Sequence, residues 1–126
     1  MGFMLEKTAT GSTPYIQIDE ERGYMIFKGE SFHENVVEFY KETGDWLKRY
    51  MAGDFSRFTF DCELRYFNSS TAKLILNILM ELDARAAEGR RVTVNWITSE
   101  DNDIIRECGE DFLEEVHHLE FNFVVV

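Results

Sequence analysis

The sequence predicts a two-layer α/β domain, with a mixed sheet of about five strands and three helices on one face of that sheet. The first observation is an initial pair of strand-like segments followed by alternating helices and strands, in the order β-β-α-β-α-β-α-β. Strands separated by helices usually lie parallel and are joined by right-handed crossovers. The second observation is that the strands alternate apolar and polar residues, whereas strands buried on both faces are continuously apolar. We therefore expect the helices to cover one face and to leave the other largely in contact with water.

Length and composition support one folded domain. The chain has 126 residues, of which 44% are hydrophobic, enough for a single core. Residues 1–13 are rich in Gly, Ser and Thr and are expected to form a flexible head, and residues 14–126 a single α/β domain. The net charge of −11 argues against nucleic acid or an anionic membrane as a partner, because both need a basic face. It favours a soluble protein with a basic protein as its partner.

The sequence also bears on location and cofactors. No apolar run approaches the ~20 residues that cross a bilayer, and the N-terminal segment does not resemble a secretory signal. The two cysteines, Cys62 and Cys108, have no close spacing, so neither a disulfide framework nor a metal site is expected. A reducing cytoplasm and the absence of a cofactor are the expectations.

The first half of the domain contains a hairpin and a helix. The alternating runs TPYIQID and GYMIFKG, joined by EERG, predict a β-hairpin. A capping-box pattern over residues 31–34 opens the first helix, although a start nearer Asn35 fits as well. Gly53 ends this helix. Its apolar side is formed by Val36, Phe39, Tyr40, Thr43, Leu47 and Tyr50.

The second half alternates strands and helices. The run RFTFDCELRYF, residues 57–67, alternates apolar and polar residues and predicts a strand. A helix follows from Asn68 or Ser69 to about Glu88, where Gly89 is a natural end. The run RRVTVNWI predicts the next strand, residues 100–116 the third helix, and LEFNFVVV the last strand.

Catalytic chemistry finds weak support in this sequence. Asp61 and Glu63 point to the same face of one strand, and paired carboxylates can act as general acid and base. The same face carries Thr59 and Arg65, which is typical of a solvated sheet. Glycine-rich phosphate-binding motifs are missing from the sequence. We therefore do not expect an enzyme, and keep a small enzyme using Asp61 and Glu63 as the alternative.

Two adjacent histidines end an acidic helix. His117 and His118 lie at the Glu-x-x-His spacing of some metal sites. Such sites need further ligands from other elements, and the third histidine, His33, lies in a distant segment. Imidazolium groups at the end of a helix also suit its dipole. We therefore interpret the pair as structural.

The stretch FNSSTAK places four small polar residues at the start of the second helix: Asn68, Ser69, Ser70 and Thr71. Either Asn68 or Ser69 can accept a hydrogen bond from an unpaired N–H group and cap the helix, worth roughly 1 kcal/mol. A helix start has a partial positive charge, so it tolerates an added phosphoryl group without unfolding. The junction also lies at the carboxyl end of a strand, where open α/β sheets present functional loops. The stretch is thus either a cap with polar neighbours or a site where a hydroxyl is modified.

The helix after this stretch has an apolar stripe and an apolar rim. The stripe is formed by Leu74, Ile75, Ile78, Leu79 and Leu82. Leu76 and Met80 lie outside its centre, where they either complete the core or form a docking surface. Methionine suits a surface that meets more than one partner, because its side chain is adaptable.

The segment YFNSSTAKLILNILMELDARAAEGRRVTVNW resembles the core of the SiaC-type biofilm regulatory phosphoproteins. The likeness extends to STPYIQID and to GESFHENVVEFYKETGDWL. The element order also resembles the STAS domain of anti-anti-sigma factors, in which a partner kinase phosphorylates a serine at this junction. Their motif is Asp-Ser-Ser/Thr-Gly, from which Asn68-Ser69-Ser70-Thr71 departs. In the SiaC-type family the modified hydroxyl follows the Asn, which corresponds to Ser69.

The resemblance implies a STAS-like partner switch. A dedicated protein kinase would phosphorylate Ser69, with Ser70 and Thr71 as alternatives, and a metal-dependent phosphatase would reverse the reaction. One form would bind a target such as a diguanylate cyclase, which links the switch to cyclic di-GMP and biofilm formation. Asn68 would cap the helix. The docking surface would comprise Ser70, Thr71, Leu76 and Met80. An interaction domain without modification is the third possibility.

Overall fold

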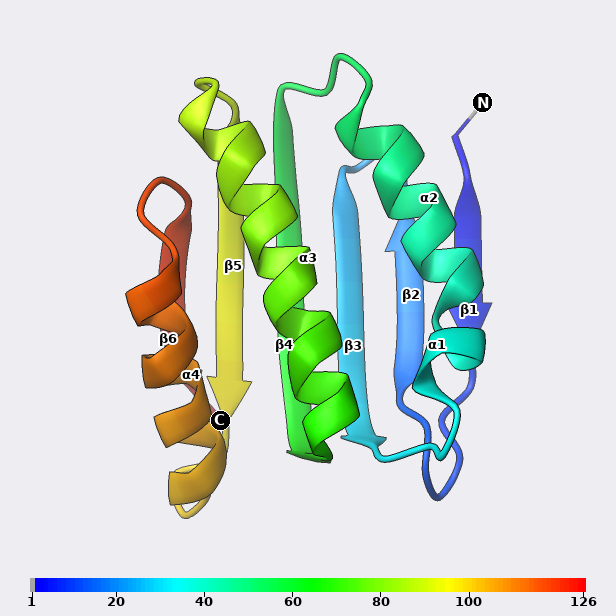
Figure 1. Cartoon of the computed structure of the whole chain (residues 1–126), viewed down its shortest axis with the longest axis vertical. Helices are drawn as coiled ribbons and strands as arrows, with labels where there is room; N and C mark the ends of the chain where they lie inside the picture. The colour runs from blue at the N-terminus through cyan, green and yellow to red at the C-terminus, as the bar shows by residue number, and fades with distance from the viewer. Residues whose placement is uncertain (1) are drawn as a thin grey trace.

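A computed structural model describes residues 2–126, which form one mixed sheet of six strands with four helices on one face (Figure 1). The strands follow each other in the order β1-β2-β3-β4-β5-β6. The pairs β1–β2 and β2–β3 are antiparallel, and the pairs β3–β4, β4–β5 and β5–β6 are parallel. The predicted two-layer α/β class is confirmed, with one strand and one helix more than expected.

The strands are β1 (Met4–Lys7), β2 (Tyr15–Asp19), β3 (Tyr24–Ser31), β4 (Arg57–Phe67), β5 (Arg91–Thr98) and β6 (Glu120–Val125). The helices are α1 (Val36–Phe39), α2 (Lys41–Met51), α3 (Ser69–Ala87) and α4 (Asp103–Glu115).

The additional strand lies in the segment predicted to be a flexible head. β1 pairs with β2 at the edge of the sheet, with Leu5 opposite Ile18. Four residues with one partly buried side carry too weak an alternation to predict a strand. The pairing depends on the neighbouring hairpin, so the prediction that the whole of residues 1–13 is flexible is wrong for β1.

The additional helix comes from a break in the predicted first helix. α1 begins after Asn35, whose side-chain oxygen accepts a hydrogen bond from the N–H of Glu38 at 3.2 Å. α2 begins one residue after Tyr40, the C-cap of α1. The capping box predicted at residues 31–34 is wrong, because Ser31 ends β3 and is buried. The alternative start nearer Asn35 is confirmed.

The core lies between the sheet and the helices. The inward residues of β4, Phe58, Phe60, Cys62 and Leu64, are all buried, as the alternation predicts. α4 packs very closely on the sheet, because a Cβ atom on Gly109 would overlap the ring of Trp96. The indole N–H of Trp96 donates to the carbonyl of Ile105 at 2.8 Å and fixes this contact.

A buried carboxylate joins α3 to the segment before β6. Asp83 accepts hydrogen bonds from the backbone N–H groups of His117, His118 and Leu119, at 2.8 to 3.2 Å. Burial raises the pKa of this carboxyl, but the three N–H groups outweigh it and hold the pKa below its ordinary value. The histidine pair therefore contributes its backbone here. In residues 2–126 no three side chains of His, Cys, Asp or Glu gather closely enough to hold a metal ion.

None of the helices in the described part of the chain is sufficiently long and apolar to span a membrane.

Candidate functional site at the start of α3

The candidate site forms where β4 ends and α3 begins. Asn68 is the N-cap of α3, and its side-chain oxygen accepts a hydrogen bond from the N–H of Thr71 at 2.9 Å. The N–H of Asn68 donates to the carbonyl of Ser31 at 3.1 Å. Ser31 and Phe67 are paired ends of the parallel strands β3 and β4. The site thus lies at the carboxyl edge of the parallel strands and is fixed to two of them.

The three hydroxyl residues after the cap have different environments. Ser69 and Ser70 are exposed, whereas Thr71 is completely buried. The Thr71 hydroxyl donates to the carbonyl of Ser31 at 3.1 Å and lies 2.9 Å from the Ser31 hydroxyl. The Ser31 hydroxyl in turn lies 2.7 Å from the hydroxyl of Tyr40. Burial raises the pKa of Tyr40, so this phenol keeps its proton.

The predicted role of Thr71 needs correction. Its hydroxyl is part of the buried chain Thr71–Ser31–Tyr40, which ties the start of α3 to β3 and to the junction of α1 and α2. A kinase or a docking partner cannot reach it in the folded protein. Ser69 and Ser70 remain as accessible hydroxyls.

Ser69 heads a line of residues along the outer side of α3. Lys73, Leu76 and Met80 follow it at spacings of four, seven and eleven, which place them on one side of a helix. Lys73 is exposed, Leu76 is half-buried and the Met80 side chain is 45% exposed. The rim predicted from Leu76 and Met80 therefore lies in line with Ser69 and reaches the surface mainly at Met80.

Lys73 is a residue that the sequence reasoning missed. It lies one turn after Ser69, where its ammonium group can approach a negative charge on the serine. The signal was available in the sequence as an i, i+4 spacing from a hydroxyl to a lysine. The spacing brings the two side chains together only if Ser69 is itself in the helix, and the structure shows that it is the first helical residue.

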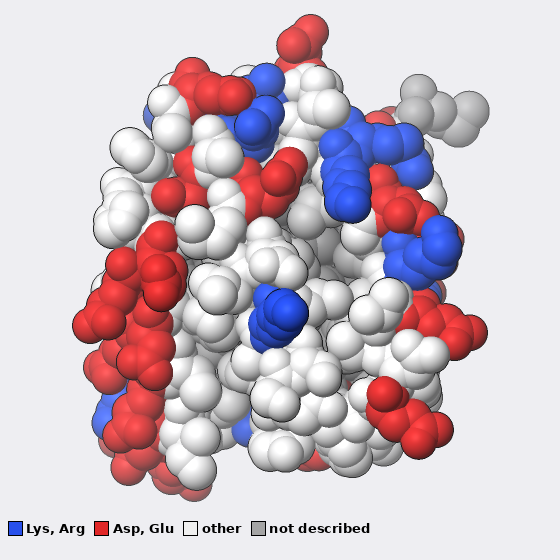
Figure 2. Space-filling model, viewed as in Figure 1, with Lys and Arg blue, Asp and Glu red and all other residues white. Residues whose placement is uncertain are grey.

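A mainly apolar groove lies beside Ser70, between α3 and the pair α1–α2. Its volume is about 490 Å³. Its apolar lining comes from Val36, Val37, Leu47, Leu74 and Ile78. The sequence could not predict this groove, because it depends on how closely α2 approaches α3. Figure 2 shows a largely uncharged surface over the lower half of α3, in contrast to the strongly acidic surface along α4.

The alternative catalytic pair lies on the sheet face away from the helices. Asp61 accepts hydrogen bonds from the hydroxyl of Tyr24 and from the amide of Asn95, both at 2.8 Å. Its carboxylate is thus part of a row of hydrogen bonds across the strands. The hollow beside Glu63 measures about 110 Å³ and does not include Asp61. This arrangement gives no support to a joint acid–base role for Asp61 and Glu63.

Comparison with known proteins assigns the chain to a class of regulatory phosphoproteins. A family model described as SiaC family regulatory phosphoprotein matches residues 6–126. An uncharacterised protein of Pseudomonas aeruginosa (strain UCBPP-PA14) is 33% identical over 106 residues, which are 84% of each chain. The chain belongs to the SiaC family, as its sequence resemblance predicted.

Two solved structures show the same fold. SiaC of Pseudomonas aeruginosa is 29% identical, with a TM-score of 0.90 over 99% of this chain and 100% of that one. The second structure contains the diguanylate cyclase SiaD in complex with its activator SiaC, from the same organism. Its matching chain is 30% identical, with a TM-score of 0.91 over 97% of this chain and 99% of that one.

Proposed function

We propose that this protein is a cytoplasmic partner switch controlled by reversible phosphorylation of Ser69. A dedicated kinase adds the phosphoryl group, a metal-dependent phosphatase removes it, and one of the two forms binds a diguanylate cyclase. The protein acts by binding and has no catalytic reaction of its own. The observation that carries the proposal is the exposed Ser69 hydroxyl on the first residue of a well-anchored helix.

The surroundings of Ser69 suit a phosphate. The Asn68 side chain caps the N–H of Thr71, and the first N–H groups of a helix have no partner within the helix. A phosphoryl group brings about −1.5 to −2 charges at pH 7 and three strong acceptors. The positive end of α3 and the ammonium group of Lys73 both attract this charge. Ser70 is the exposed alternative, one residue further into the helix.

The cyclase partner is proposed from the family relationship. The solved complex contains a cyclase with its activator SiaC, whose fold this chain shares closely. On this chain, Ser70, Leu76 and Met80 and the groove beside Ser70 offer partly apolar surface next to the switch residue. A phosphate beside such a surface adds a strongly hydrated charge, which has to be paired or desolvated when a partner docks. Its addition or removal therefore changes the affinity and connects the switch to cyclic di-GMP and biofilm formation.

The mass of the intact protein tests the modification itself. The wild-type protein is incubated with ATP and its cognate kinase. We expect one added phosphoryl group, which is lost in Ser69→Ala and retained in the matched control Ser70→Ala. An added group that survives in Ser69→Ala and disappears in Ser70→Ala would move the site to Ser70. If the wild-type protein gains no phosphoryl group, the switch is contradicted and the alternative of an interaction domain without modification is favoured.

A further inference from the structure

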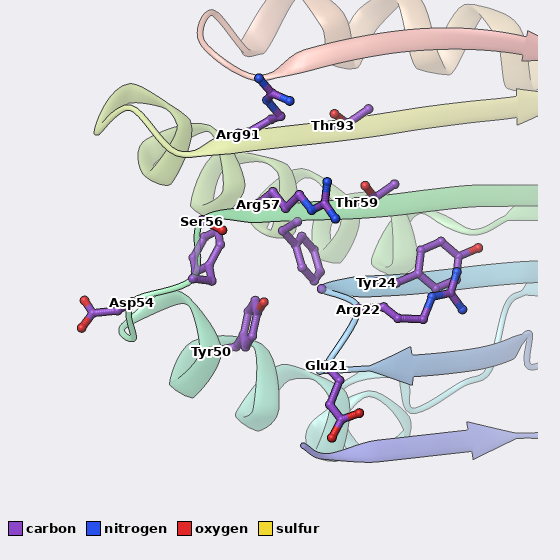
Figure 3. A pocket seen from close by; sticks show the side chains of 13 residues that line it. Glu21, Arg22, Tyr24, Tyr50, Asp54, Ser56, Arg57, Thr59, Arg91 and Thr93 are labelled. Atoms are coloured by element: carbon purple, nitrogen blue, oxygen red, sulfur yellow. The ribbon is translucent and has the colours of Figure 1, made fainter. Parts of the chain in front are cut away.

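A second polar site lies at the other end of the sheet from Ser69, and extends from the face without helices around the end of the strands to Tyr50 of α2. It is a hollow of about 870 Å³ at the amino ends of β4 and β5 (Figure 3). Arg57 is the first residue of β4 and Arg91 the first of β5, and the register places them opposite each other. The next residues on the same face, Thr59 and Thr93, are also opposite each other. A pair of guanidinium groups therefore borders a pair of hydroxyls, and Figure 3 shows all four side chains on the same side of the strands.

The arginine pair is unfavourable for the folded chain alone. Like charges directly opposite each other on neighbouring strands are destabilising. The chain has 24 acidic residues against 13 Lys and Arg, so carboxylates are abundant. Nevertheless, among residues 2–126, neither Arg57 nor Arg91 forms an ion pair. By contrast, Arg65, on the same face of β4, pairs with Glu30 at 3.4 Å.

The acidic residues around the hollow do not neutralise this pair. Glu21 and Asp54 border it, but in Figure 3 their carboxylates point away from the two arginines. A third guanidinium, that of Arg22, lies at the same hollow over the ring of Tyr24. It is 3.8 Å from Asp19, at the long end of an ion pair. The hollow thus combines three cations with hydroxyl donors on a strongly acidic protein.

We infer that this hollow binds the phosphate group of a small molecule between Arg57 and Arg91. Guanidinium groups donate paired hydrogen bonds to phosphate oxygens, and two of them match the charge of a phosphate dianion. The hydroxyls of Thr59 and Thr93 supply further donors on the same side.

The size of the hollow favours an organic phosphate. Its volume lies in the ~300 to 1,000 Å³ range of small-molecule sites and exceeds the needs of one phosphate ion. The stacked rings of Tyr50 and Phe55, with centroids 5.0 Å apart, line another part of it and suit the less polar remainder of a ligand. β4 runs from Arg57 to Phe67, which separates the hollow from Ser69 by roughly 30 Å. The ligand would therefore not contact the proposed phosphorylation site, and the inference stands independently of that proposal.

The test is a titration of the isotope-labelled full chain followed by NMR at constant ionic strength. The probes are adenosine 5′-monophosphate, inorganic phosphate and uncharged adenosine. We expect both phosphate compounds to shift the amide signals of Arg57, Thr59, Arg91 and Thr93 saturably, and adenosine to leave them in place. Tighter binding of the nucleotide assigns the site to an organic phosphate, and equal affinities assign it to free phosphate. Failure of both phosphate compounds to bind would overturn the inference.

Matched variants separate a built site from general charge attraction. The double variant Arg57→Gln/Arg91→Gln is expected to weaken nucleotide binding roughly 100-fold, because each charge-assisted interaction is worth about a factor of ten. Arg65→Gln removes a positive charge from the same face of β4 and is expected to change the affinity less than about two-fold, because Arg65 lies outside the hollow. Equal weakening by Arg65→Gln and by either single variant at Arg57 or Arg91 would contradict a specific site.

Thermal unfolding provides an independent measurement. In buffer without phosphate, Arg91→Gln is expected to unfold at or above the wild-type temperature, because it removes a like-charge pair. Addition of adenosine 5′-monophosphate is expected to raise the unfolding temperature of the wild-type protein but not that of the double variant. A wild-type unfolding temperature that does not respond to a saturating concentration would contradict the inference.

Discussion

Ser69, Ser70 and Thr71 are consecutive residues, yet their hydroxyls have different surroundings. Thr71 is buried and bonded to Ser31, which also contacts Tyr40. Asn68 caps the helix through the N–H of Thr71. These contacts fix the start of α3 without using the Ser69 side chain. A change of charge at Ser69 can therefore alter binding while the fold stays intact.

Because of this difference, substitutions at Ser69 and Thr71 are expected to change the stability of the protein by different amounts. Ser69→Asp is expected to change the free energy of unfolding by less than about 0.5 kcal/mol, because the side chain is exposed and a negative charge suits a helix start. Thr71→Val keeps the shape but removes a buried hydroxyl, and is expected to cost about 1 to 3 kcal/mol because the buried hydroxyl and carbonyl of Ser31 each lose one of their hydrogen-bond partners. Chemical denaturation measures both values. A loss for Ser69→Asp as large as that for Thr71→Val would show that Ser69 supports the fold.

The sequence predicted a polar helix start but could not separate its hydroxyls. The separation depends on Ser31, which is 40 positions from Thr71. The capping-box pattern at residues 31–34 even assigned Ser31 to a helix. A local sequence pattern cannot predict that the side chain of Ser31 forms a hydrogen bond with a residue of a distant element. Ser69 itself was identified from the family resemblance and not from its local chemistry.

At the scale of elements, strong alternation predicted the structure well and short segments did not. β4 has the predicted bounds, residues 57–67, because its eleven residues alternate clearly. α3 ends near the predicted position, with Gly89 in a left-handed conformation two residues after Ala87. β1 is short and lies at an edge, so it could be predicted only once the neighbouring strand β2 was known. α4 begins later than expected because Asn102 caps it through the N–H of Ile105.

Replacement of glycine by alanine is expected to have opposite effects on stability at two positions within helices. Gly109→Ala is expected to destabilise the protein by about 1 to 3 kcal/mol, because the added methyl group overlaps Trp96 and forces α4 away from the sheet. Gly44→Ala in α2 has open space around it and is expected to stabilise the protein by about 0.5 to 1 kcal/mol through helix propensity. Thermal or chemical unfolding compares the two variants. Stabilisation by Gly109→Ala would contradict the close packing of α4 on β5.

At the scale of the whole molecule, the sheet separates the two regions to which we assign a function. Ser69 is the first residue of α3 and lies at the carboxyl edge of the parallel strands, and the uncharged surface of α3 lies on the side of the helices (Figure 2). The arginine hollow lies at the amino edge, where Arg57 and Arg91 are on the face without helices and Tyr50 of α2 lines its other side. α4 carries a dense acidic surface along one side of the molecule (Figure 2). A partner that docks on α3 therefore meets apolar surface bordered by negative charge.

The docking surface predicts a specific effect of one methionine. Met80→Glu places a charge on the exposed rim of α3 and is expected to weaken binding to the cyclase at least about ten-fold, because a buried charge has to be desolvated. Met4→Glu adds the same charge at a similarly exposed methionine on β1, at the far edge of the sheet, and is expected to leave the affinity within about two-fold. Surface plasmon resonance with the purified cyclase compares them. Equal affinities of the two variants would show that Met80 on the α3 rim is not part of the interface.

The measurement that tests the switch most directly is the affinity for the proposed diguanylate cyclase partner before and after phosphorylation of Ser69. The wild-type protein and Ser69→Ala are each treated with the kinase, and the affinities are measured by isothermal titration calorimetry. We predict that phosphorylation changes the wild-type affinity at least about ten-fold, which corresponds to ~1.4 kcal/mol, and leaves Ser69→Ala unchanged. Affinities of the phosphorylated and unphosphorylated wild-type protein that agree within about two-fold would contradict a partner switch at Ser69.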